Sequence, residues 1–557
     1  MANADCIVIQ GSNMAEAHPV GFQWVIEAKK RGARIIHVDP RFTRTSALAD
    51  KHIPIRGGSD VVLLGAVINY VLENELYFEE YVKSFTNAST IIHDDFQDTE
   101  DLNGLFSGYD PETGKYDNTT WQPKPAWDAE VSWDVEKDET LQDPRCVFQI
   151  LKRHYSRYTP EMVQKACGIP QEDFFYLARS IAENSGRERT TCFAYALGWT
   201  QHTMGAQFIR TCAILQLLMG NVGRPGSGIM ALRGHASIQG STDVPTLFHL
   251  LPGYLPMPQA EVQTWDEYLS AVAKPDQKGF WQKGDTYSVS LMKAYWGDAA
   301  TEDNNWGMDL MPRLTGAHST YHTLQLMNQG LVDGYFVFGQ NPAVAASNGH
   351  MQRMALSKLK WLVVRDFQEI ETATFWKDSP EIATGDLVTE EIDTEVFLFP
   401  AANHVEKAGT FTQTQRLLQW RFKAKNPPGD ADSDLQFFYE LGLRLKDRVK
   451  DSTDPRDLPL QKITWDYDVD ADGEIDPESV LREINGYYLE GPRKGELVDK
   501  FADLKADGTT SSGCWIYCGV FAGDVNRAAN KRPGSEQDEM ALDWGWAWPM
   551  NRRVLYN

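Results

Sequence analysis

One pattern occurs twice in this sequence and limits its possible folds more than any other feature. Its first copy begins with an apolar run, Cys6–Gln10, and passes through Gly11-Ser12-Asn13 into a helical pattern over residues 14–31. A second apolar run over residues 34–38 then ends at Asp39. Short apolar runs separated by a turn and a helical segment predict a strand, a tight turn, a helix and a second strand.

The second copy lies in the later half of the chain and has the same order of parts. An apolar run over residues 335–338 is followed by the turn Gly339-Gln340-Asn341, a helical pattern over 343–358, and a run over 360–365 that ends at Asp366. This copy therefore also predicts a strand, a turn, a helix and a strand.

The spacing within the two copies is nearly identical. Gly11 and Asp39 are 28 positions apart, Gly339 and Asp366 are 27 apart, and each Asp is followed six positions later by a threonine, Thr45 or Thr372. Such an order is typical of the first βαβ unit of a mononucleotide-binding fold. We therefore predict an α/β chain with two Rossmann-like, doubly wound domains related as a pseudo-repeat. A coincidental α/β arrangement with two ordinary turns is the alternative.

Each copy has residue types that suit a bound nucleotide. Glycine lets the backbone approach a phosphate closely, and the N-terminus of a helix offers unpaired N–H groups. An aspartate at the end of the second strand can accept hydrogen bonds from ribose hydroxyls or from the N–H edge of guanine. Neither copy contains the GxGxxG motif of a nicotinamide-dependent dehydrogenase, which also needs only one such site.

The length of 557 residues is enough for more than one core. We predict a first domain over residues 1–232 with an acidic, turn-rich insertion near 93–145, and a second domain over 233–445. Residues 446–557 would form an insertion, acidic and loop-rich over 446–500, and a truncated connection toward a C-terminal domain expected outside this sequence. Within the first domain, Ser59 or Asp60 is placed to cap a helix over residues 61–72.

Composition excludes some classes of function. The formal net charge of −24 argues against a nucleic-acid partner, because phosphate binding needs clustered Lys and Arg.

Seven cysteines include no CxxC pair, so they do not indicate an iron–sulfur or zinc site. Cys514 and Cys518 are four positions apart, which leaves open either two unrelated thiols or a redox or metal pair. The acidic run over 468–476 imitates a calcium loop, but its twelfth position is Ser479, so a solvated loop is the other interpretation.

A candidate anion-binding segment lies between two predicted helices. Arg233 is followed by Gly234 and His235, and a guanidinium beside a permissive backbone can hold a small carboxylate with two hydrogen bonds. His202 and His235 could carry protons or donate hydrogen bonds to a cofactor. Structural roles for all three side chains stay open at this point.

Five segments together resemble a known family: GSNMAEAHPVG, VDPRFTRT, ALGWTQH, LRGHASIQG and NRRVLYN. They are similar to the catalytic subunits of respiratory, membrane-associated formate dehydrogenases. Those subunits belong to the molybdopterin oxidoreductases that bind molybdenum or tungsten through two molybdopterin guanine dinucleotides. The resemblance extends over essentially the whole chain and implies formate oxidation to CO2.

The resemblance also implies roles for individual residues. One dinucleotide would contact Gly11, Ser12, Asn13, Glu16, His18, Asp39, Arg41, Thr43, Gly58 and Asp60. The other would contact Gly339, Gln340, Asn341, Asp366 and Thr372. Gly198, Trp199, Thr200, Gln201, His202 and Gly234 would line the pterin region, with Arg233 orienting formate and His235 as a second catalytic residue.

Other features of the family are expected outside this sequence. A cysteine-rich [4Fe–4S] segment and the Cys or selenocysteine ligand of the metal would lie upstream, so we expect no protein ligand to the metal within the chain. The partners implied are an iron–sulfur electron-transfer subunit and a membrane cytochrome b subunit. An extracytoplasmic, membrane-associated location follows by resemblance, with a cytoplasmic one as the alternative. Nitrate or polysulfide reduction, and a pterin-binding fragment without turnover, are the alternative functions.

Overall fold

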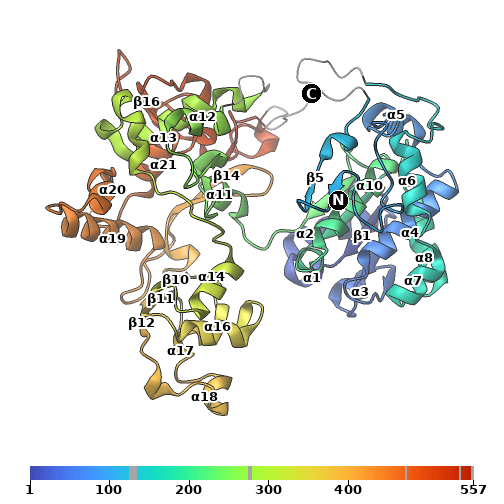
Figure 1. Ribbon diagram of the computed structural model, residues 1–557, viewed down its shortest axis with the longest axis horizontal. Helices are drawn as coiled ribbons and strands as arrows, with labels where there is room; N and C mark the ends of the chain where they lie inside the picture. Colours follow the sequence, from blue (N-terminus) through green and yellow to red (C-terminus); the bar gives the residue numbers. More distant parts are fainter. Residues whose placement is uncertain (125–134, 274–278, 471–472, 538–540, 553–557) are drawn as a thin grey trace. The chain divides into compact units, whose positions relative to one another are not determined.

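A computed structural model describes residues 1–124, 135–273, 279–470, 473–537 and 541–552 of the chain. The chain divides into two compact units, Met1–Gly234 and His235–Asn557 (Figure 1). The division falls two residues after the first predicted boundary. As a consequence, Arg233 and His235 belong to different units.

Unit 1 is built around a parallel sheet of five strands in the order β3-β2-β1-β6-β7. The strands are β1 (Cys6–Gln10), β2 (Arg34–Val38), β3 (Lys51–Ile53), β6 (Thr191–Tyr195) and β7 (Gly228–Ala231). In the register, Ile7 pairs with Ile35 on one side and with Cys192 on the other. The strand order runs outward from β1 in both directions, which is the doubly wound arrangement.

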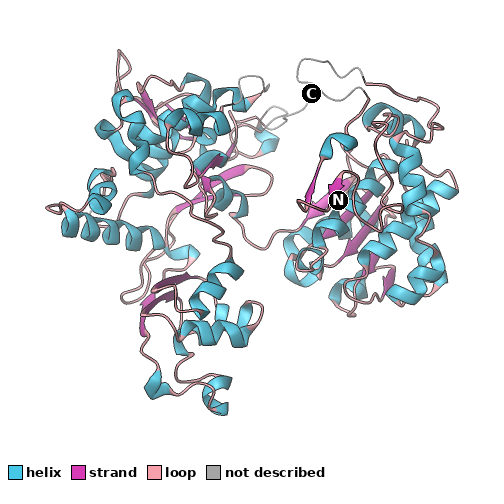
Figure 2. Cartoon of the chain, viewed as in Figure 1, coloured by secondary structure: helices cyan, strands magenta, loops and turns pink. Residues whose placement is uncertain are grey.

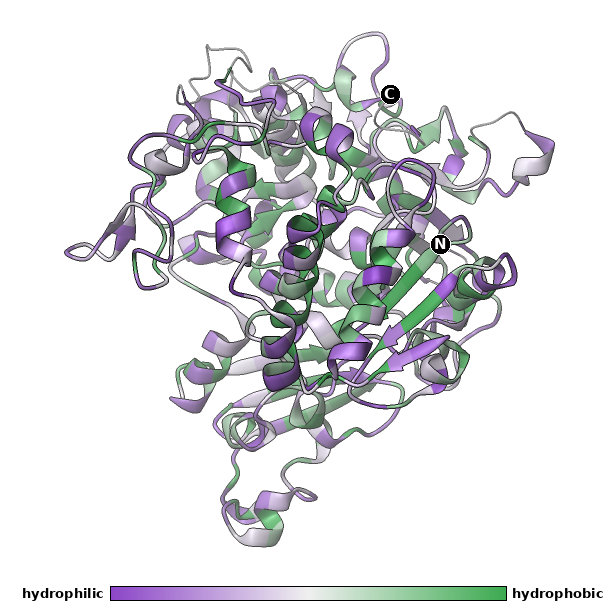
Figure 3. Cartoon of the chain, turned by 90° about the vertical axis from the view of Figure 1, so that its right-hand side faces the viewer, coloured by the Kyte–Doolittle hydropathy of each residue, from purple (hydrophilic) through white to green (hydrophobic). Residues whose placement is uncertain are grey.

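Burial on both faces explains why the strands are continuously apolar. Every residue of β1 and β6 is buried, as expected for a parallel sheet covered by helices on both sides (Figures 2 and 3). Successive side chains point to opposite faces, so Val8 and Ile36 enter one hydrophobic core and Ile7 enters another.

The helices of unit 1 cover this sheet. They are α1 (Met14–Ala17), α2 (Pro19–Lys30), α3 (Arg44–Leu48), α4 (Asp60–Glu73), α5 (Glu79–Phe85), η1 (Asn118–Trp121), α6 (Val147–Tyr155), α7 (Pro160–Cys167), α8 (Gln171–Glu183), α9 (Leu197–Thr200) and α10 (Gly205–Leu218). The single helix predicted over 14–31 is divided at His18, because Pro19 lacks the N–H that would continue it. Two short strands, β4 (Tyr109–Asp110) and β5 (Lys115–Tyr116), form a hairpin within the predicted insertion.

Unit 2 contains a second parallel sheet, of three strands. They are β10 (Gly334–Phe338), β11 (Trp361–Asp366) and β12 (Glu395–Pro400), in the order β10-β11-β12. No strand pairs with the outer edge of β10 among the residues that the structure describes. A doubly wound second sheet therefore stays a prediction, whereas the parallel α/β class is confirmed.

The remaining strands of unit 2 are short and antiparallel. β13 (Gly409–Thr412), β14 (Leu417–Arg421) and β19 (Trp546–Ala547) form one sheet, and the pairs are β8 (Leu250–Leu251) with β9 (Leu255–Pro256), β15 (Tyr487–Tyr488) with β16 (Thr510–Ser511), and β17 (Phe521–Ala522) with β18 (Val525–Asn526).

Helices of unit 2 form two groups. Those nearest the three-stranded sheet in the chain are α14 (Thr320–Asn328), α15 (Pro342–Ala345), α16 (Gly349–Leu356), α17 (Glu371–Thr374) and α18 (Pro380–Thr384). The others include α11 (Ile238–Asp243), α12 (Trp265–Val272), α13 (Gly284–Trp296), α19 (Asp434–Val449), α20 (Leu458–Lys462) and α21 (Pro477–Asn485). The segment LRGHASIQG, which the sequence places in a loop, thus enters a helix at Ile238.

The described residues of unit 2 form two hydrophobic cores. One lies beside β10–β12 and contains Val337 and Leu362. The other joins distant parts of the chain, including Trp296, Trp420 and Trp515. Residues on both sides of the boundary predicted near 445 share that core, so the chain does not separate there into two cores. Among the described residues, no helix combines the length and apolar content needed to span a bilayer.

Candidate functional site

The predicted site residues of unit 1 gather at one edge of its sheet. Gly11 follows β1, Asp39 follows β2, Gly58 and Asp60 come after β3, residues 198–202 come after β6, and Arg233 comes after β7. Parallel strands bring their carboxyl ends to the same edge. Because the order reverses between β1 and β6, the crevice beside these two strands is the place where such folds bind ligands.

Two glycines let the turns after β1 and β6 pack directly against each other. The carbonyl oxygen of Gly11 accepts hydrogen bonds from the N–H groups of Ala196, at 3.3 Å, and Gly198, at 3.0 Å. Gly11 has φ +70°, and a Cβ atom there would lie 2.9 Å from Cδ1 of Trp199. A Cβ on Gly198 would lie 2.6 Å from Cα of Gly11. Contact between the turns therefore requires glycine at both positions.

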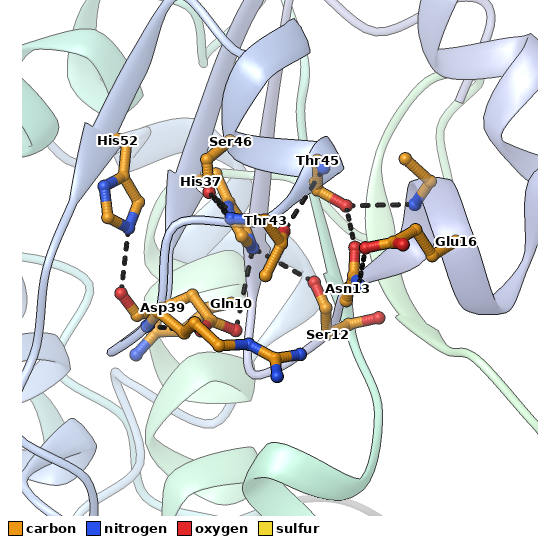
Figure 4. Close-up of polar contacts among 12 residues, drawn as sticks. Gln10, Ser12, Asn13, Glu16, His37, Asp39, Thr43, Thr45, Ser46 and His52 are labelled. Atoms are coloured by element: carbon orange, nitrogen blue, oxygen red, sulfur yellow. Dashed lines mark hydrogen bonds and ion pairs between the residues drawn. The ribbon is translucent and has the colours of Figure 1, made fainter.

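A polar network joins the turn after β1 to the loop after β2 (Figure 4). Thr45 Oγ1 donates to Asn13 Oδ1, at 2.9 Å, and accepts from the N–H of Ala15, also at 2.9 Å. Asn13 Nδ2 donates to Glu16 Oε2 at 2.5 Å. We call Gly11, Ser12, Asn13, Asp39 and Thr45 the first cradle.

The corresponding threonine and asparagine of unit 2 make the same contacts with each other, whereas the glutamate that binds the asparagine comes from a different position, directly before the threonine. Thr372 Oγ1 donates to Asn341 Oδ1, at 2.8 Å, and accepts from the N–H of Ala343, at 3.2 Å. Asn341 Nδ2 donates to Glu371 Oε2 at 2.5 Å. We call Gly339, Gln340, Asn341, Asp366 and Thr372 the second cradle. Thr45 and Thr372 thus hold the side chain of the turn asparagine in the same way.

The two aspartates order the backbone that follows them. Asp39 Oδ1 accepts a hydrogen bond from the N–H of Arg41, at 2.8 Å, and Asp366 Oδ1 accepts from that of Phe367, at 2.7 Å. Thr43 caps α3, since its hydroxyl oxygen accepts from the N–H of Thr45 at 3.2 Å. Arg41 is exposed at this loop.

Asp60 is not the helix cap that the sequence predicts. Its Oδ1 accepts hydrogen bonds from Gln10 Nε2, at 2.8 Å, and Trp199 Nε1, at 3.1 Å, and burial raises the pKa of its carboxyl. Ser59 occupies the N-cap position without a side-chain hydrogen bond to the helix. Asp60 therefore holds the indole of Trp199 against Gly11 in the turn after β1. Gln10 was missed by sequence reasoning, although a polar residue at the end of an apolar strand is a usable signal.

The turn after β6 exposes the next predicted residues. Thr200, Gln201 and His202 are exposed, whereas Trp199 is fully buried. A Cβ atom on Gly58 would lie 3.6 Å from Nδ1 of His202, so these two residues are neighbours at the sheet edge.

Arg233 is held at the same edge through its main chain. His18 Nε2 donates a hydrogen bond to the carbonyl oxygen of Arg233 at 3.0 Å. The Arg233 side chain is exposed, and among the described residues its guanidinium has no hydrogen bond or ion pair. Gly234 follows with no atom within 4 Å of the position that a Cβ would take. The guanidinium is thus available to an anion.

In unit 2, His235 is exposed and its ring has a defined partner. Nδ1 accepts a hydrogen bond from the N–H of Ser237 at 2.9 Å. Nδ1 is therefore unprotonated, and a neutral ring has its proton on Nε2. In this arrangement His235 is a hydrogen-bond donor rather than a base.

Unsatisfied buried atoms show where a polar ligand fits. Three polar atoms are buried without a hydrogen-bond partner: Gln10 Oε1 at the end of β1, Ser12 Oγ in the turn after it, and His18 Nδ1 between α1 and α2. Buried polar atoms normally have partners, so a polar ligand here would satisfy them. At the second cradle, no atom lies within 4 Å of the position of a Cβ on Gly339, which leaves that turn open.

The side chains that could bind a metal do not cluster in the part of the chain that the structure describes. Within the described ranges, no group of three or more His, Cys, Asp or Glu side chains could hold a metal ion. Cys514 and Cys518 are buried, and burial raises the pKa of the Cys518 thiol to about 12, so it is not a thiolate. Residues 471–472 of the calcium-like run lie outside the described residues.

Comparison with known proteins identifies the family. Residues 1–375 match the family described as molybdopterin oxidoreductase. The chain belongs to this family. Membership implies a molybdopterin cofactor with molybdenum or tungsten, and the unsatisfied polar atoms of Gln10, Ser12 and His18 fit such a group.

Two curated relatives are similar to the whole chain. The nitrate-inducible formate dehydrogenase major subunit of Escherichia coli K12 is 42% identical over 100% of this chain and 55% of that protein. Formate dehydrogenase 2 subunit alpha (cytochrome c-553) of Nitratidesulfovibrio vulgaris is 38% identical over the same shares. The chain therefore spans about half the length of these relatives. A solved structure, acetylene hydratase from Pelobacter acetylenicus, is 15% identical with a TM-score of 0.45, over 80% of this chain and 47% of that one.

Proposed function

We propose that this chain forms the cofactor-binding body of a formate dehydrogenase catalytic subunit that oxidises formate to CO2. The observation that supports this most is the position of Arg233, whose guanidinium is unpaired among the described residues while His18 anchors its main chain. A guanidinium fork holds a carboxylate with two parallel hydrogen bonds, which a lysine cannot reproduce. The names of both relatives support formate as the substrate.

The chemistry requires formate to lose a proton and two electrons. The metal–pterin group supplies the electron acceptor when it is bound. Arg233 would hold the two carboxylate oxygens and so orient the C–H bond. His235, as the second catalytic residue, would donate a hydrogen bond from Nε2, because its Nδ1 already accepts one from the N–H of Ser237.

Two molybdopterin guanine dinucleotides would be bound, one at each cradle. The matched contacts of Asn13 with Thr45 and of Asn341 with Thr372 support two similar sites. Asp39 and Asp366 would accept hydrogen bonds from ribose or guanine with the carboxylate oxygen that the backbone does not occupy. A [4Fe–4S] cluster would be bound by residues outside this sequence.

Electrons would pass to other subunits. We propose an iron–sulfur protein as the partner and a membrane cytochrome b as a further one, with no nucleic acid involved. The names of the two relatives, a major subunit and a subunit alpha, support a multisubunit enzyme. An extracytoplasmic, membrane-associated location belongs to the same proposal, and fractionation of the native cells tests it against a cytoplasmic one.

The substrate is tested on the full-length gene product with Arg233→Lys. We expect kcat/KM for formate to fall at least about a hundredfold, because a charge-assisted pair of hydrogen bonds is lost. Arg31→Lys, at the exposed end of α2, is the matched control and should leave kcat/KM unchanged. Full activity of Arg233→Lys, or turnover of nitrate or polysulfide instead of formate, would contradict the proposal.

The cofactor is tested on the chain alone. Protein purified from a host that makes the molybdenum cofactor is extracted with acid, and the released nucleotide is identified by chromatography. Two guanine nucleotides per chain are expected. Release of adenine or nicotinamide nucleotides would overturn the assignment, and formate oxidation assayed on the same sample shows whether the chain alone turns over.

A further inference from the structure

His37 is a buried polar residue on β2, the strand that leads to Asp39 of the first cradle. It lies on β2, its side chain is 0% exposed, and the residues beside it on the strand are apolar. Its Nε2 lies 3.1 Å from the carbonyl oxygen of Ser12, in the turn after β1. Its Nδ1 lies 2.7 Å from Oγ of Ser46, on α3. One imidazole ring therefore touches both loops of the first cradle (Figure 4).

These partners fix the position of the proton on the ring. A carbonyl oxygen only accepts, so Nε2 donates to Ser12. Ser46 Oγ already accepts from the N–H of Thr43, at 2.9 Å, in the capping box of α3. Its own O–H can then donate to Nδ1. The neutral ring with its proton on Nε2 satisfies every group in this chain of hydrogen bonds.

The second cradle offers an internal comparison. The residue two positions before Asp366 is Val364, where the first cradle has His37, and the residue after Thr372 is Ala373, where it has Ser46. Both are buried. The polar pair of one copy is thus replaced by an apolar pair in the other, while the contacts of Asn341 with Thr372 are kept. The link through His37 is an addition to the first cradle and not a requirement of the fold.

We propose that His37 is a positioning residue, which as the neutral Nε2–H tautomer ties the Ser12 turn to the Thr43–Ser46 cap and so preorganises the first cradle for a guanine nucleotide. This rests on the proposed function, because it assigns a role within the proposed nucleotide site. Preorganisation strengthens binding, since the turn loses less freedom when the ligand arrives.

The surroundings of the ring oppose its protonation. The titratable groups that face it are Asp39, whose Oδ2 is 3.7 Å from Nε2, and His52 on β3, whose ring centroid is 5.7 Å away. Burial lowers the pKa of His37 more than the Asp39 carboxylate raises it. The neutral tautomer is therefore the form present near pH 7.

Tautomer and local order are tested on the full chain without any ligand. In nitrogen NMR of protein labelled at histidine, with His37→Asn for assignment, the His37 ring should show a protonated Nε2 and an unprotonated Nδ1 at pH 7. In amide hydrogen exchange, the double variant His37→Val/Ser46→Ala, which copies the apolar pair of the second cradle, should exchange faster at residues 11–14 and 43–46. A protonated Nδ1, or unchanged exchange at both segments, would overturn the proposal.

The second cradle is the control within the same molecule, because its residues 339–345 should exchange at the same rate in both proteins. The double variant removes the acceptor of the Thr43 N–H and the donor to the Ser12 carbonyl, but it introduces the same apolar pair that the second cradle contains, so it is expected to fold. If it does not, Ser46→Ala alone is measured in the same way, and unchanged exchange at residues 43–46 would then contradict the proposal.

Binding is tested with guanosine diphosphate as the probe. Exchange protection at residues 10–18 by the nucleotide should need about tenfold more nucleotide in the double variant, and protection at 339–345 should not change. Equal protection of 10–18 in both proteins would contradict a positioning role. Protection at neither cradle in the unaltered chain would contradict the proposed nucleotide sites. The tautomer and amide-exchange measurements, which need no ligand, would still test whether His37 orders the two segments.

Discussion

His18 and Arg233 are 215 positions apart in the sequence, yet His18 Nε2 donates a hydrogen bond to the carbonyl oxygen of Arg233 at 3.0 Å. This contact places the loop after β7 beside the junction of α1 and α2. The guanidinium of Arg233 is then presented from a backbone that is fixed at its base.

Replacing His18 should loosen this loop. In the full-length protein, we expect His18→Ala to lower kcat/KM for formate about tenfold, since the main chain of Arg233 loses its anchor. His18→Gln, which keeps a donor, should retain most of the activity. Amide exchange at residues 231–234 checks the cause, and an alanine variant with wild-type exchange there would contradict it.

Gly11→Ala should destabilise unit 1. The φ of +70° and the 2.9 Å approach to Trp199 both oppose a Cβ, so we expect a loss of about 2 kcal/mol or more in the free energy of unfolding. Gly339→Ala, also at positive φ but with open space around it, should cost only about 1 kcal/mol. Denaturant unfolding of both variants measures the difference, and equal losses would show that the contact between the turns is unimportant.

Thr45→Val and Thr372→Val should each impair one cradle. Each change removes the hydroxyl that holds the turn asparagine, at 2.9 Å in the first cradle and 2.8 Å in the second. We expect each variant to retain one guanine nucleotide per chain and the double variant none. The corresponding serine variants keep the hydroxyl and serve as controls. Two nucleotides in a valine variant would argue against the cradles as binding sites.

Glu483 should make the stability of unit 2 depend on pH. Its carboxyl is buried beside the hydroxyl of Tyr467, 2.8 Å away, and burial raises its pKa to about 7. The unfolded chain ionises this group near its ordinary pKa of about 4.3, so its contribution to stability is complete below that pH and is lost as the pH rises toward 7.

Glu483→Gln removes this cost of ionisation. The variant should be more stable than the unaltered chain at pH 8, by about 2 kcal/mol, and equal to it near pH 4. Glu490→Gln, at an exposed position, is the control and should change neither value. Thermal unfolding at the two pH values measures this, and a destabilised Glu483→Gln variant at pH 8 would refute the assignment.

Local sequence pattern predicted the positions of strands and turns in both copies well. The strands at Cys6–Gln10 and Trp361–Asp366, both turns and the threonines after them lie where the spacing put them, because apolar runs and glycine turns act over a few residues. The same reasoning failed at Asp60, whose position before a helix indicates a cap. In the structure its carboxylate instead accepts hydrogen bonds from Gln10 and Trp199, which are far away in sequence.

By itself, the sequence determined the parallel α/β class, the two matched turns and the family, since each depends on residue order and short spacings. Only the tertiary structure decided that His37 links two segments, that Gly11 packs closely against Trp199, and that Trp296 and Trp515 share a core. The physical reason is packing. Contacts between distant segments depend on strand order and on which faces are buried, and no local spacing records them.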